Sequence, residues 1–426
     1  MKRWIGAALA ACPFVVCAQE VNTGDSAWIL TSTALVLFMT LPGLALFYGG
    51  LVRTKNVLSV LMQCFAITCV VSVLWLLLVY SLAFGAGGPF IGGLGKALFA
   101  GVEEGSVSGT IPETAFAMFQ LTFAVITPAL VVGGFAERMK FSSMLLFSSL
   151  WVIAVYAPVC HWVWASDGWL FKLGLLDFAG GTVVHITAGV ASLVAAVTLG
   201  RRQGFPQTPM MPHNMTMTVT GAAMLWVGWF GFNGGSALAA NGNAAMAILV
   251  THLSAAAGAS AWAVMEWVRY GKPSALGTVT GMVAGLGTIT PASGYVGPGG
   301  ALVIGLLAGF LCFNATNILK RRLGVDDSLD VFPVHGVGGI LGTLLAGVFA
   351  SNALGVFSGQ GYAGEATMGS QMGVQAIGVA ATIGYTAVVT WILLKIVGAL
   401  LGLRVSAEGE SAGLDTSEHN ERGYDL

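Results

Sequence analysis

Long apolar segments recur along the whole chain, and they limit the possible fold more than any other feature of the sequence. Eleven can be distinguished after the N-terminal region, near residues 26–50, 57–84, 114–134, 141–163, 182–200, 215–236, 243–269, 275–291, 299–319, 335–353 and 374–402. A helix of about 20 apolar residues spans a hydrocarbon core roughly 30 Å thick. The pattern therefore predicts an all-α membrane protein with eleven transmembrane helices, of which the eighth is the most marginal.

The composition excludes a soluble globular domain. Charged residues make up 9% of the chain and hydrophobic residues 56%, whereas soluble domains carry about 25% charged residues. The 60 glycines predict a tightly packed bundle, because small residues let helices approach closely in lipid. A net charge of −1 argues against a nucleic acid partner, which would require a basic surface.

The N-terminus has the pattern of a secretory signal. Lys2 and Arg3 precede an apolar run at 4–16 that is too short to span a bilayer, and small residues follow at 17–18. This pattern predicts a signal peptide over 1–18 with cleavage after Ala18; the alternative is an uncleaved short anchor. The domain prediction is then a transmembrane domain over 19–402 and a cytoplasmic tail over 403–426.

Basic residues follow the odd-numbered apolar segments. These residues are Arg53, Lys55, Arg138, Lys140, Arg201, Arg202, Arg269, Lys272, Lys320, Arg321 and Arg322, whereas the connections from even to odd segments hold only Lys96 and Lys172. Since Lys and Arg are enriched in cytoplasmic loops, we expect the mature N-terminus on the periplasmic side and the C-terminus in the cytoplasm. The expected location is the inner membrane of a bacterium.

The chain also repeats a short pattern. Asp177 precedes His185 by eight residues, and Asp327 precedes His335 by eight. A glycine follows each histidine four residues later, and FYGG at 47–50 is echoed by FNGG at 232–235. Five segments separate the equivalent elements, so the second copy is inverted in the membrane. We therefore expect a five-plus-five inverted repeat with an extra C-terminal helix, and two histidines that meet near the midplane.

Three interpretations of His185 and His335 follow from the residues alone. Each could be a core residue bonded to a backbone carbonyl. The pair could belong to a metal site, although no matched third ligand is present. Alternatively, the two imidazoles could line a narrow path for a small polar solute or its proton, because imidazole donates on one nitrogen and accepts on the other.

Several motifs in this order resemble the ammonium transporter family, Amt/Mep/Rh, in its bacterial Amt form. They are FYGGLVRTKN (47–56), GFAERMKF (134–141), DFAGGTVVH (177–185), GWFGFNGGS (228–236) and DVFPVHGVGG (330–339). The resemblance extends from about residue 25 into the tail. It implies a homotrimer with eleven helices and one pore per subunit, no cofactor and no enzymatic chemistry.

The resemblance also implies roles for individual side chains. Phe119, Trp164, Ser236 and Asp177 correspond to an outer ammonium-recruitment site, Phe123 and Phe232 to a gate, and His185, His335 and Trp229 to the pore. The implied mechanism recruits ammonium, deprotonates it and conducts ammonia through a hydrophobic twin-histidine pore, with separate proton transfer. Ordinary roles remain open beside these: helix packing for Phe119 and Phe123, an interfacial anchor for Trp164, and a helix N-cap for Asp177.

The C-terminal stretch differs sharply from the rest. Its polar and acidic composition predicts a flexible cytosolic tail, whereas the resemblance implies a segment that packs on the cytoplasmic face, couples subunits and meets a PII-type signalling protein. Pro333, two residues before His335, fits a helix start. Alternative functions are an ammonium sensor that signals through its tail, and an Rh-like channel for a neutral gas. An intramembrane enzyme would need a nucleophile or metal triad, and we identify none in the sequence.

Overall fold

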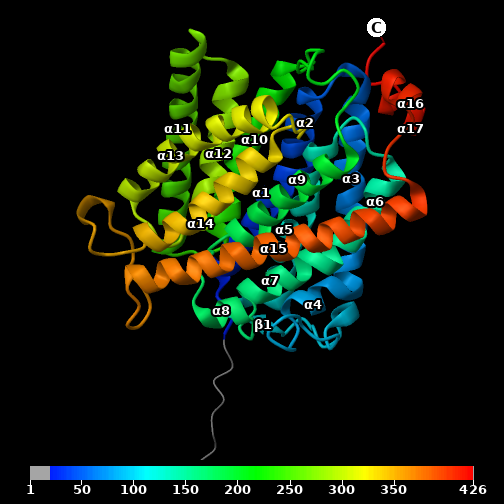
Figure 1. Ribbon diagram of the computed structural model, residues 1–426. Coiled ribbons are helices and arrows are strands. Elements are labelled where there is room, and N and C mark those ends of the chain that lie inside the picture. The colour runs from blue at the N-terminus through cyan, green and yellow to red at the C-terminus, as the bar shows by residue number, and fades with distance from the viewer. Residues whose placement is uncertain (1–19, 426) are drawn as a thin grey trace, which may run out of the picture.

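The computed structural model describes residues 20–425, so the predicted signal peptide lies outside the described residues. The chain folds into one bundle of packed helices (Figure 1). The first half contains α1 (Thr23–Phe38), η1 (Met39–Leu44), α2 (Ala45–Leu51), η2 (Thr54–Asn56), α3 (Val57–Leu74), η3 (Trp75–Val79), α4 (Tyr80–Phe84), η4 (Ala97–Phe99), α5 (Glu113–Phe135), α6 (Phe141–Trp151), η5 (Val152–Tyr156), α7 (Ala157–Trp164), α8 (Trp169–Leu173), η6 (Gly181–Ile186) and α9 (Thr187–Leu199).

The second half contains α10 (Met215–Trp229), η7 (Phe230–Gly234), α11 (Gly242–Tyr270), α12 (Ala275–Ile289), α13 (Pro298–Asn317), η8 (Ile318–Arg322), η9 (Phe332–Gly336), α14 (Val337–Phe349), η10 (Gly355–Phe357), α15 (Met368–Leu401), α16 (Ala407–Ala412) and α17 (Leu414–His419). A short antiparallel hairpin, β1 (Val107–Ser108) and β2 (Ile111–Pro112), precedes α5.

Helices match the predicted apolar segments within a few residues at most ends. Within residues 20–425, ten helical runs are long and apolar enough to cross a membrane, and α12 is a shorter apolar helix at the position of the eighth segment. The largest difference is at α15, which begins at Met368 rather than near residue 374. A multi-pass membrane protein is therefore confirmed.

Several spans contain π-helical turns, which the apolar pattern did not predict. The π-helical turns are η1, η3, η5, η6, η7, η8 and η9. π-Helical turns are rare in proteins, and those that do occur are often found at functional sites. His185 lies in η6 and His335 in η9, where Pro333 occupies the start of the turn as expected.

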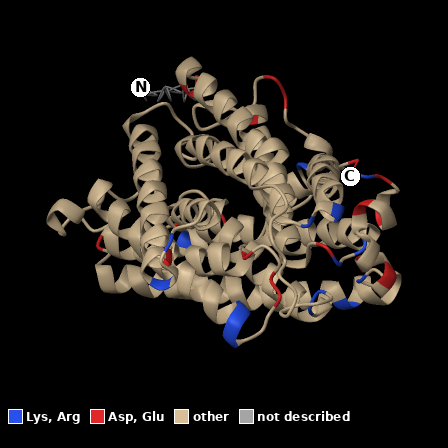
Figure 2. Ribbon diagram, turned by 90° about the horizontal axis from the view of Figure 1, so that it is seen from above, with Lys and Arg blue, Asp and Glu red and all other residues tan. Residues whose placement is uncertain are grey.

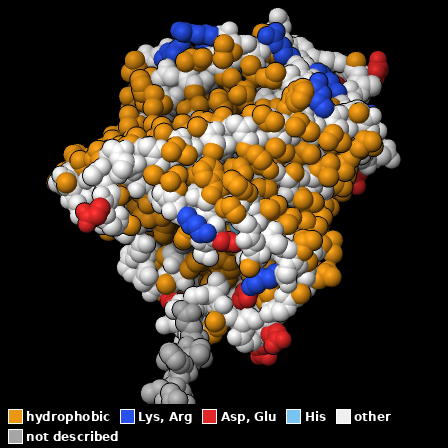
Figure 3. Space-filling model, turned by 60° about the horizontal axis from the view of Figure 1, so that its bottom comes forward, with side chains coloured by type: hydrophobic (Ala, Val, Ile, Leu, Met, Phe, Trp, Pro, Cys, Tyr) orange, Lys and Arg blue, Asp and Glu red, His pale blue; other side chains and the backbone are white. Residues whose placement is uncertain are grey.

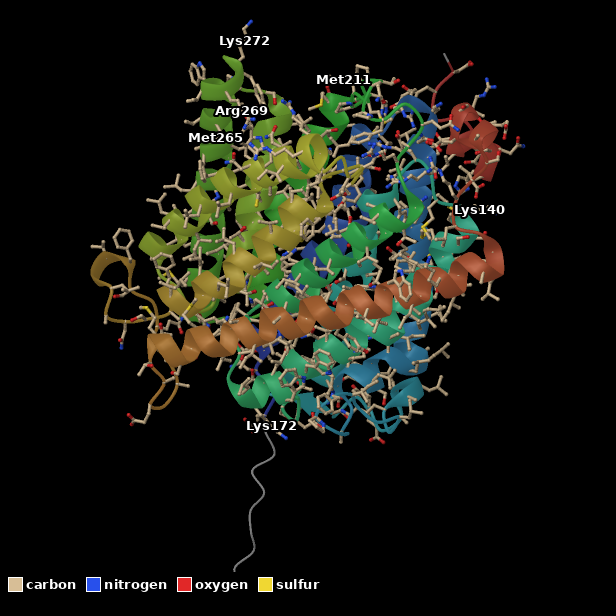
Figure 4. All side chains as sticks on the ribbon, viewed as in Figure 1. Lys140, Lys172, Met211, Met265, Arg269 and Lys272 are labelled. Atoms are coloured by element: carbon tan, nitrogen blue, oxygen red, sulfur yellow. The ribbon has the colours of Figure 1, made fainter. Side chains whose placement is uncertain are left out.

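The beginning of the described chain and its C-terminal helices lie at opposite ends of the bundle. The described chain begins at the lower end in Figure 1, and α16 and α17 lie at the upper end. Arg269 and Lys272 project at the upper end and Lys172 at the lower end (Figure 4). Between the ends, one face shows a broad band of hydrophobic side chains (Figure 3). This distribution is the one expected for a bundle that crosses a bilayer.

A buried ionic cluster ties together the connections after α2, α5, α9 and η8. Lys and Arg are concentrated in the first three connections and in η8, and these segments form the basic end of the bundle. The carboxylate of Glu137 accepts hydrogen bonds from the Arg53 and Asn56 side chains and from Arg202 Nη1, at 2.8 to 3.0 Å. Arg202 also forms an ion pair of 2.7 Å with Asp326. Although burial raises the pKa of Glu137, the charges of Arg202 and Arg53 hold it below its ordinary value.

The C-terminal tail is folded, so the prediction of a flexible segment from its composition is wrong. Its side chains occupy helix N-termini: Asp415 accepts hydrogen bonds from Leu58 N and Ser59 N of α3, and Glu418 accepts one from Phe141 N of α6. Figure 2 shows acidic and basic segments gathered around this end of the chain. Carboxylates at helix N-termini bond unpaired amides and interact favourably with the helix dipole, and this explains why an acidic segment packs here.

Candidate functional site

Two imidazole rings meet inside the bundle. The Nδ1 atoms of His185 and His335 are 3.1 Å apart, and the rings stack at 5.2 Å with an angle of 16°. Both side chains are buried, at 1% and 4% exposure. Because a hydrogen bond needs one donor and one acceptor, only one of the two Nδ1 atoms carries the shared hydrogen.

Two glycines that follow the histidines bring the helices together. A Cβ on Gly189 would lie 2.3 Å from Gly336, and a Cβ on Gly339 would lie 2.9 Å from the Gly181 carbonyl oxygen. Each glycine of the repeated pattern therefore packs against the segment that carries the other histidine. Any larger side chain would push η6 and η9 apart and separate the rings.

The segment before each histidine is fixed by an aspartate. Asp177 accepts hydrogen bonds from the amides of Gly180, Gly181 and Thr182 at 2.6 to 2.8 Å, and also from the Thr182 hydroxyl. The carboxylate is 4% exposed and faces the start of η6. Asp177 therefore caps the N-terminus of this helical segment. These hydrogen bonds also orient the segment, which carries His185.

Asp327 occupies the matching position before η9, with fewer partners. It accepts one bond of 2.7 Å from Phe332 N and a longer one of 3.4 Å from the Ser192 hydroxyl. Burial, together with the nearby charge of Asp330, raises the pKa of Asp327 to about 6. Three residues after each aspartate the backbone has a positive φ, 120° at Gly180 and 61° at Asp330.

An outer cavity of about 120 Å³ lies beyond the histidines. It is lined by Phe84, Phe116, Gln120, Phe123, Trp164, Phe178, Ser236 and Leu238. The Ser236 hydroxyl donates to the Phe232 carbonyl at 2.8 Å, so its oxygen lone pairs remain available as acceptors. Trp164 Nε1 donates to the Asp177 carbonyl at 3.0 Å, which ties the cavity wall to the capped segment.

The predicted outer-site residues divide into two groups. Trp164 and Ser236 line the outer cavity, whereas Phe119 is fully buried and its ring packs 5.0 Å from that of Phe123. On α5, residues 116, 119, 120 and 123 are related by three- and four-residue spacings and lie on one side of the helix, so helical spacing alone does not distinguish Phe119 from the lining residues. The same spacing could have indicated Phe116 and Gln120 from the sequence, and both were missed, as were Phe84, Phe178 and Leu238.

Two phenylalanines separate the outer cavity from the histidines. The rings of Phe123 and Phe232 lie 4.5 Å apart. Phe123 lines the outer cavity, and Phe232 lines a void of about 10 Å³ that also contacts His185, His335 and Trp229. This volume is close to that of a single water-sized probe. Phe123 and Phe232 therefore lie in contact between the outer cavity and the histidines.

Trp229 and the inner cavity complete the path. The Trp229 ring stacks 5.5 Å from His185, and its Nε1 donates to the Thr290 hydroxyl at 2.9 Å. On the other side, His335 lines an inner cavity of about 300 Å³ whose wall includes Asp330 and Lys320, paired at 2.8 Å. Outer cavity, aromatic pair, twin histidines and inner cavity thus follow one another through the bundle.

The free nitrogens of the histidine pair determine what the path can do. Nε2 of His185 is buried and has no hydrogen-bond partner among residues 20–425. If both rings are neutral, one presents an N–H at Nε2 and the other a lone pair. No group of three metal-binding side chains is found in that same range. The path suits a small neutral molecule with hydrogen-bonding capacity.

Comparison with known proteins gives consistent matches over nearly the whole chain. Residues 27–424 match the model of the Ammonium Transporter Family. The chain is 46% identical to the ammonium transporter of Bacillus subtilis (strain 168), over 95% of this chain and 99% of that protein. It is 46% identical to the ammonium transporter Amt1 of Archaeoglobus fulgidus, over 95% of this chain and all of that one.

Solved structures agree with these matches. Mep2 of Saccharomyces cerevisiae is similar with a TM-score of 0.84 and 39% identity, covering 91% of this chain and 89% of its own. A protein described as a sensor Amt protein is similar with a TM-score of 0.85 and 29% identity, covering 93% of this chain and 98% of its own.

Proposed function

The chain belongs to the ammonium transporter family, and from this premise we propose that it recruits ammonium at the outer cavity and conducts ammonia past the twin histidines. Its relatives are ammonium transporters, so the chain is a multi-pass membrane transporter and not an enzyme. The observation that carries the proposed mechanism is the contact of His185 with His335 on a narrow apolar path.

Recruitment begins with a cation among aromatic rings. Ammonium is attracted to aromatic faces by about 0.5–2 kcal/mol, and the rings of Phe123 and Trp164 both line the outer cavity. Ser236 adds an oxygen acceptor for one N–H. Phe119 supports the wall from behind through its contact with Phe123. Asp177 acts indirectly, because it fixes the segment to which Trp164 is hydrogen bonded.

Deprotonation follows because the path beyond the gate is apolar. Moving a cation to the centre of a bilayer costs at least about 2.5–3.5 kcal/mol. Removing the proton from ammonium, whose pKa is roughly two units above neutral, costs about 3 kcal/mol at 1.36 kcal/mol per unit. Ammonia can then pass between Phe123 and Phe232 when their contact opens. Potassium has no proton to lose, and therefore it is excluded.

The histidine pair accounts for separate proton transfer. The proton lost by ammonium passes to the Nε2 lone pair of one ring, and the shared hydrogen moves from the Nδ1 of that ring to the Nδ1 of the other. A proton then leaves from the Nε2 of the second ring. His335 lines the inner cavity, so the departing proton has an exit. The result is electrogenic transport of ammonia and a proton by two routes.

The architecture extends this proposal. We infer that α12, which lies at the position of the eighth apolar segment, adds an eleventh span to the ten long ones, because its 15 residues pack against α11 and α13. The reciprocal glycine contacts and the two aspartate-capped segments support an inverted repeat. The resemblance supports a homotrimer in the inner membrane with a periplasmic N-terminus, and the ordered tail at the basic end offers a cytoplasmic face to a PII-type protein.

Currents and uptake by reconstituted protein test this function. We expect inward current and methylammonium uptake with unmodified protein, and loss of at least the current with His185→Ala. His252→Ala is the matched control, since His252 lies on α11 beside Trp226, away from the described path. Uptake without charge movement would contradict the electrogenic mechanism and favour a neutral gas channel. Binding without any flux would favour a sensor.

A further inference from the structure

We propose that Gln120 is an additional ammonium-binding residue, whose side-chain oxygen accepts one N–H of the ion in the outer cavity. The inference rests on the proposed recruitment of ammonium at that cavity. Gln120 lies on α5, one helical turn from Phe116 and from Phe123 on the same face, and all three line the cavity. Of the eight lining residues, only Gln120, Trp164 and Ser236 have polar side chains.

The side-chain amide of Gln120 has no hydrogen-bond partner in the described part of the chain. The side chain is 8% exposed, its oxygen is buried without a partner, and no hydrogen bond to either amide atom is found within residues 20–425. A buried polar group left unpaired costs about 1–3 kcal/mol, so most such groups in native proteins are paired. An amide that lacks a partner beside a cavity indicates a ligand that supplies one.

The other two polar groups of the cavity already have partners. The Trp164 N–H donates to the Asp177 carbonyl, and the Ser236 hydroxyl proton is donated to the Phe232 carbonyl. Ser236 therefore offers only acceptor lone pairs, and Trp164 offers only its ring face. Gln120 is the one lining group with both hydrogen-bonding functions unoccupied in the described part of the chain.

Ammonium is the complement of these groups. It carries four N–H donors and no acceptor, so it can bond the oxygens of Ser236 and Gln120 and still face the rings of Phe123 and Trp164. The NH₂ group of Gln120 would repel the ion. Because neither amide atom is held by a partner, a half-turn of the terminal torsion exchanges oxygen and nitrogen at little cost.

Two variants of nearly equal size separate binding from packing. Gln120→Met removes both hydrogen-bonding atoms, and Gln120→Glu keeps oxygens in place and removes the donor. We expect KM for methylammonium to rise about five- to tenfold in Gln120→Met, the size of one lost hydrogen bond. We expect KM to fall in Gln120→Glu, because a carboxylate attracts the cation more strongly. The maximal rate should change less than twofold in both.

The measurement is the concentration dependence of methylammonium uptake into vesicles that contain the purified protein. Thr122→Val is the matched control, because Thr122 lies on α5, bonds the Phe119 carbonyl and does not line the cavity. Its KM should equal that of the unmodified protein. A KM for Gln120→Met within twofold of normal, or a shift of the same direction in Gln120→Met and Gln120→Glu, would overturn the inference alone. Absence of uptake by the unmodified protein would instead overturn the proposed function.

Discussion

The two aspartate-led segments of the pore carry the same motif and differ in how firmly each is held. Before η6, the carboxylate of Asp177 accepts hydrogen bonds from three backbone amides at 2.6 to 2.8 Å, from a fourth at 3.4 Å and from a hydroxyl. Before η9, the buried carboxylate of Asp327 bonds one amide closely and a hydroxyl at longer range. The backbone reversal that follows uses Gly180 in the first segment and Asp330 in the second.

This difference shows that a repeated motif can position two matched side chains by unequal means. The segment before η6 is held in place by the fully hydrogen-bonded carboxylate of Asp177 and by Gly180, which permits the positive φ. The segment before η9 carries an additional charge at Asp330, which pairs with Lys320 at the wall of the inner cavity. We infer that the His185 segment is the more rigid of the two, and that the His335 segment responds more readily to protons and cations.

The largest expected effect compares loss of the two carboxylates. Asp177→Ala leaves three buried amides without a partner, and at about 1–3 kcal/mol for each it should destabilise the protein by at least 3 kcal/mol. Asp327→Ala leaves one such amide and removes an unfavourable buried charge, so it should cost about 1 kcal/mol. Thermal unfolding in detergent measures both. Equal losses would show that the segments are held equally.

A smaller effect is expected from pH. Because the pKa of Asp327 is raised to about 6 in the folded protein, the folded state binds its proton more readily than the unfolded state. Stability should therefore fall as pH rises from about 4 to about 6, by up to about 3 kcal/mol at 1.36 kcal/mol per unit. In Asp327→Asn this contribution should vanish.

The difference in melting temperature between the unmodified protein and Asp327→Asn, followed across that pH range, isolates the effect. Glu137 and Asp326 have lowered pKa values because of their arginine partners and give the opposite trend, but they are common to both proteins. A constant difference between the two melting curves would show that Asp327 stays ionised throughout.

The smallest effect concerns the backbone reversals. Gly180→Ala should destabilise by about 2 kcal/mol, since φ is 120° and the new Cβ would lie 2.7 Å from the Val184 side chain. Asp330→Gly should change stability by less than about 1 kcal/mol, because relief of the left-handed backbone offsets the lost pair with Lys320. The free energy of unfolding of each variant, measured by denaturation beside the unmodified protein, checks this order. A larger loss of stability in Asp330→Gly than in Gly180→Ala would contradict it.

Much of the fold could be predicted from the sequence because lipid imposes simple demands. Hydropathy located the spans, since each must bury its backbone bonds within one helix. The matched spacing before His185 and His335 indicated that the two rings meet, and the Nδ1 contact agrees with that expectation. The aromatic contact of Phe123 with Phe232 followed from the resemblance, not from the apolar pattern, which is equally compatible with packing.

Other features depend on partners far away in the chain, and local pattern does not contain them. The tail is acidic and polar, yet Asp415 and Glu418 find amides more than 250 residues away at the starts of α3 and α6. The burial of Phe119 against Phe123 could not have been derived from helical spacing, because both residues share a side of α5 with Phe116. Gln120 could have been noticed as the polar residue on that side.

The close approach of Gly189 to Gly336, and of Gly339 to Gly181, has a consequence for how the conduit can be redesigned. The width of the path at the two imidazoles is set by direct contact between the backbones of the two helical segments. Trimming side chains along the lumen would alter its lining, but the spacing of the walls would remain. The backbone therefore determines which molecules are small enough to pass. A wider path would require the helices that carry His185 and His335 to cross at a different distance or angle.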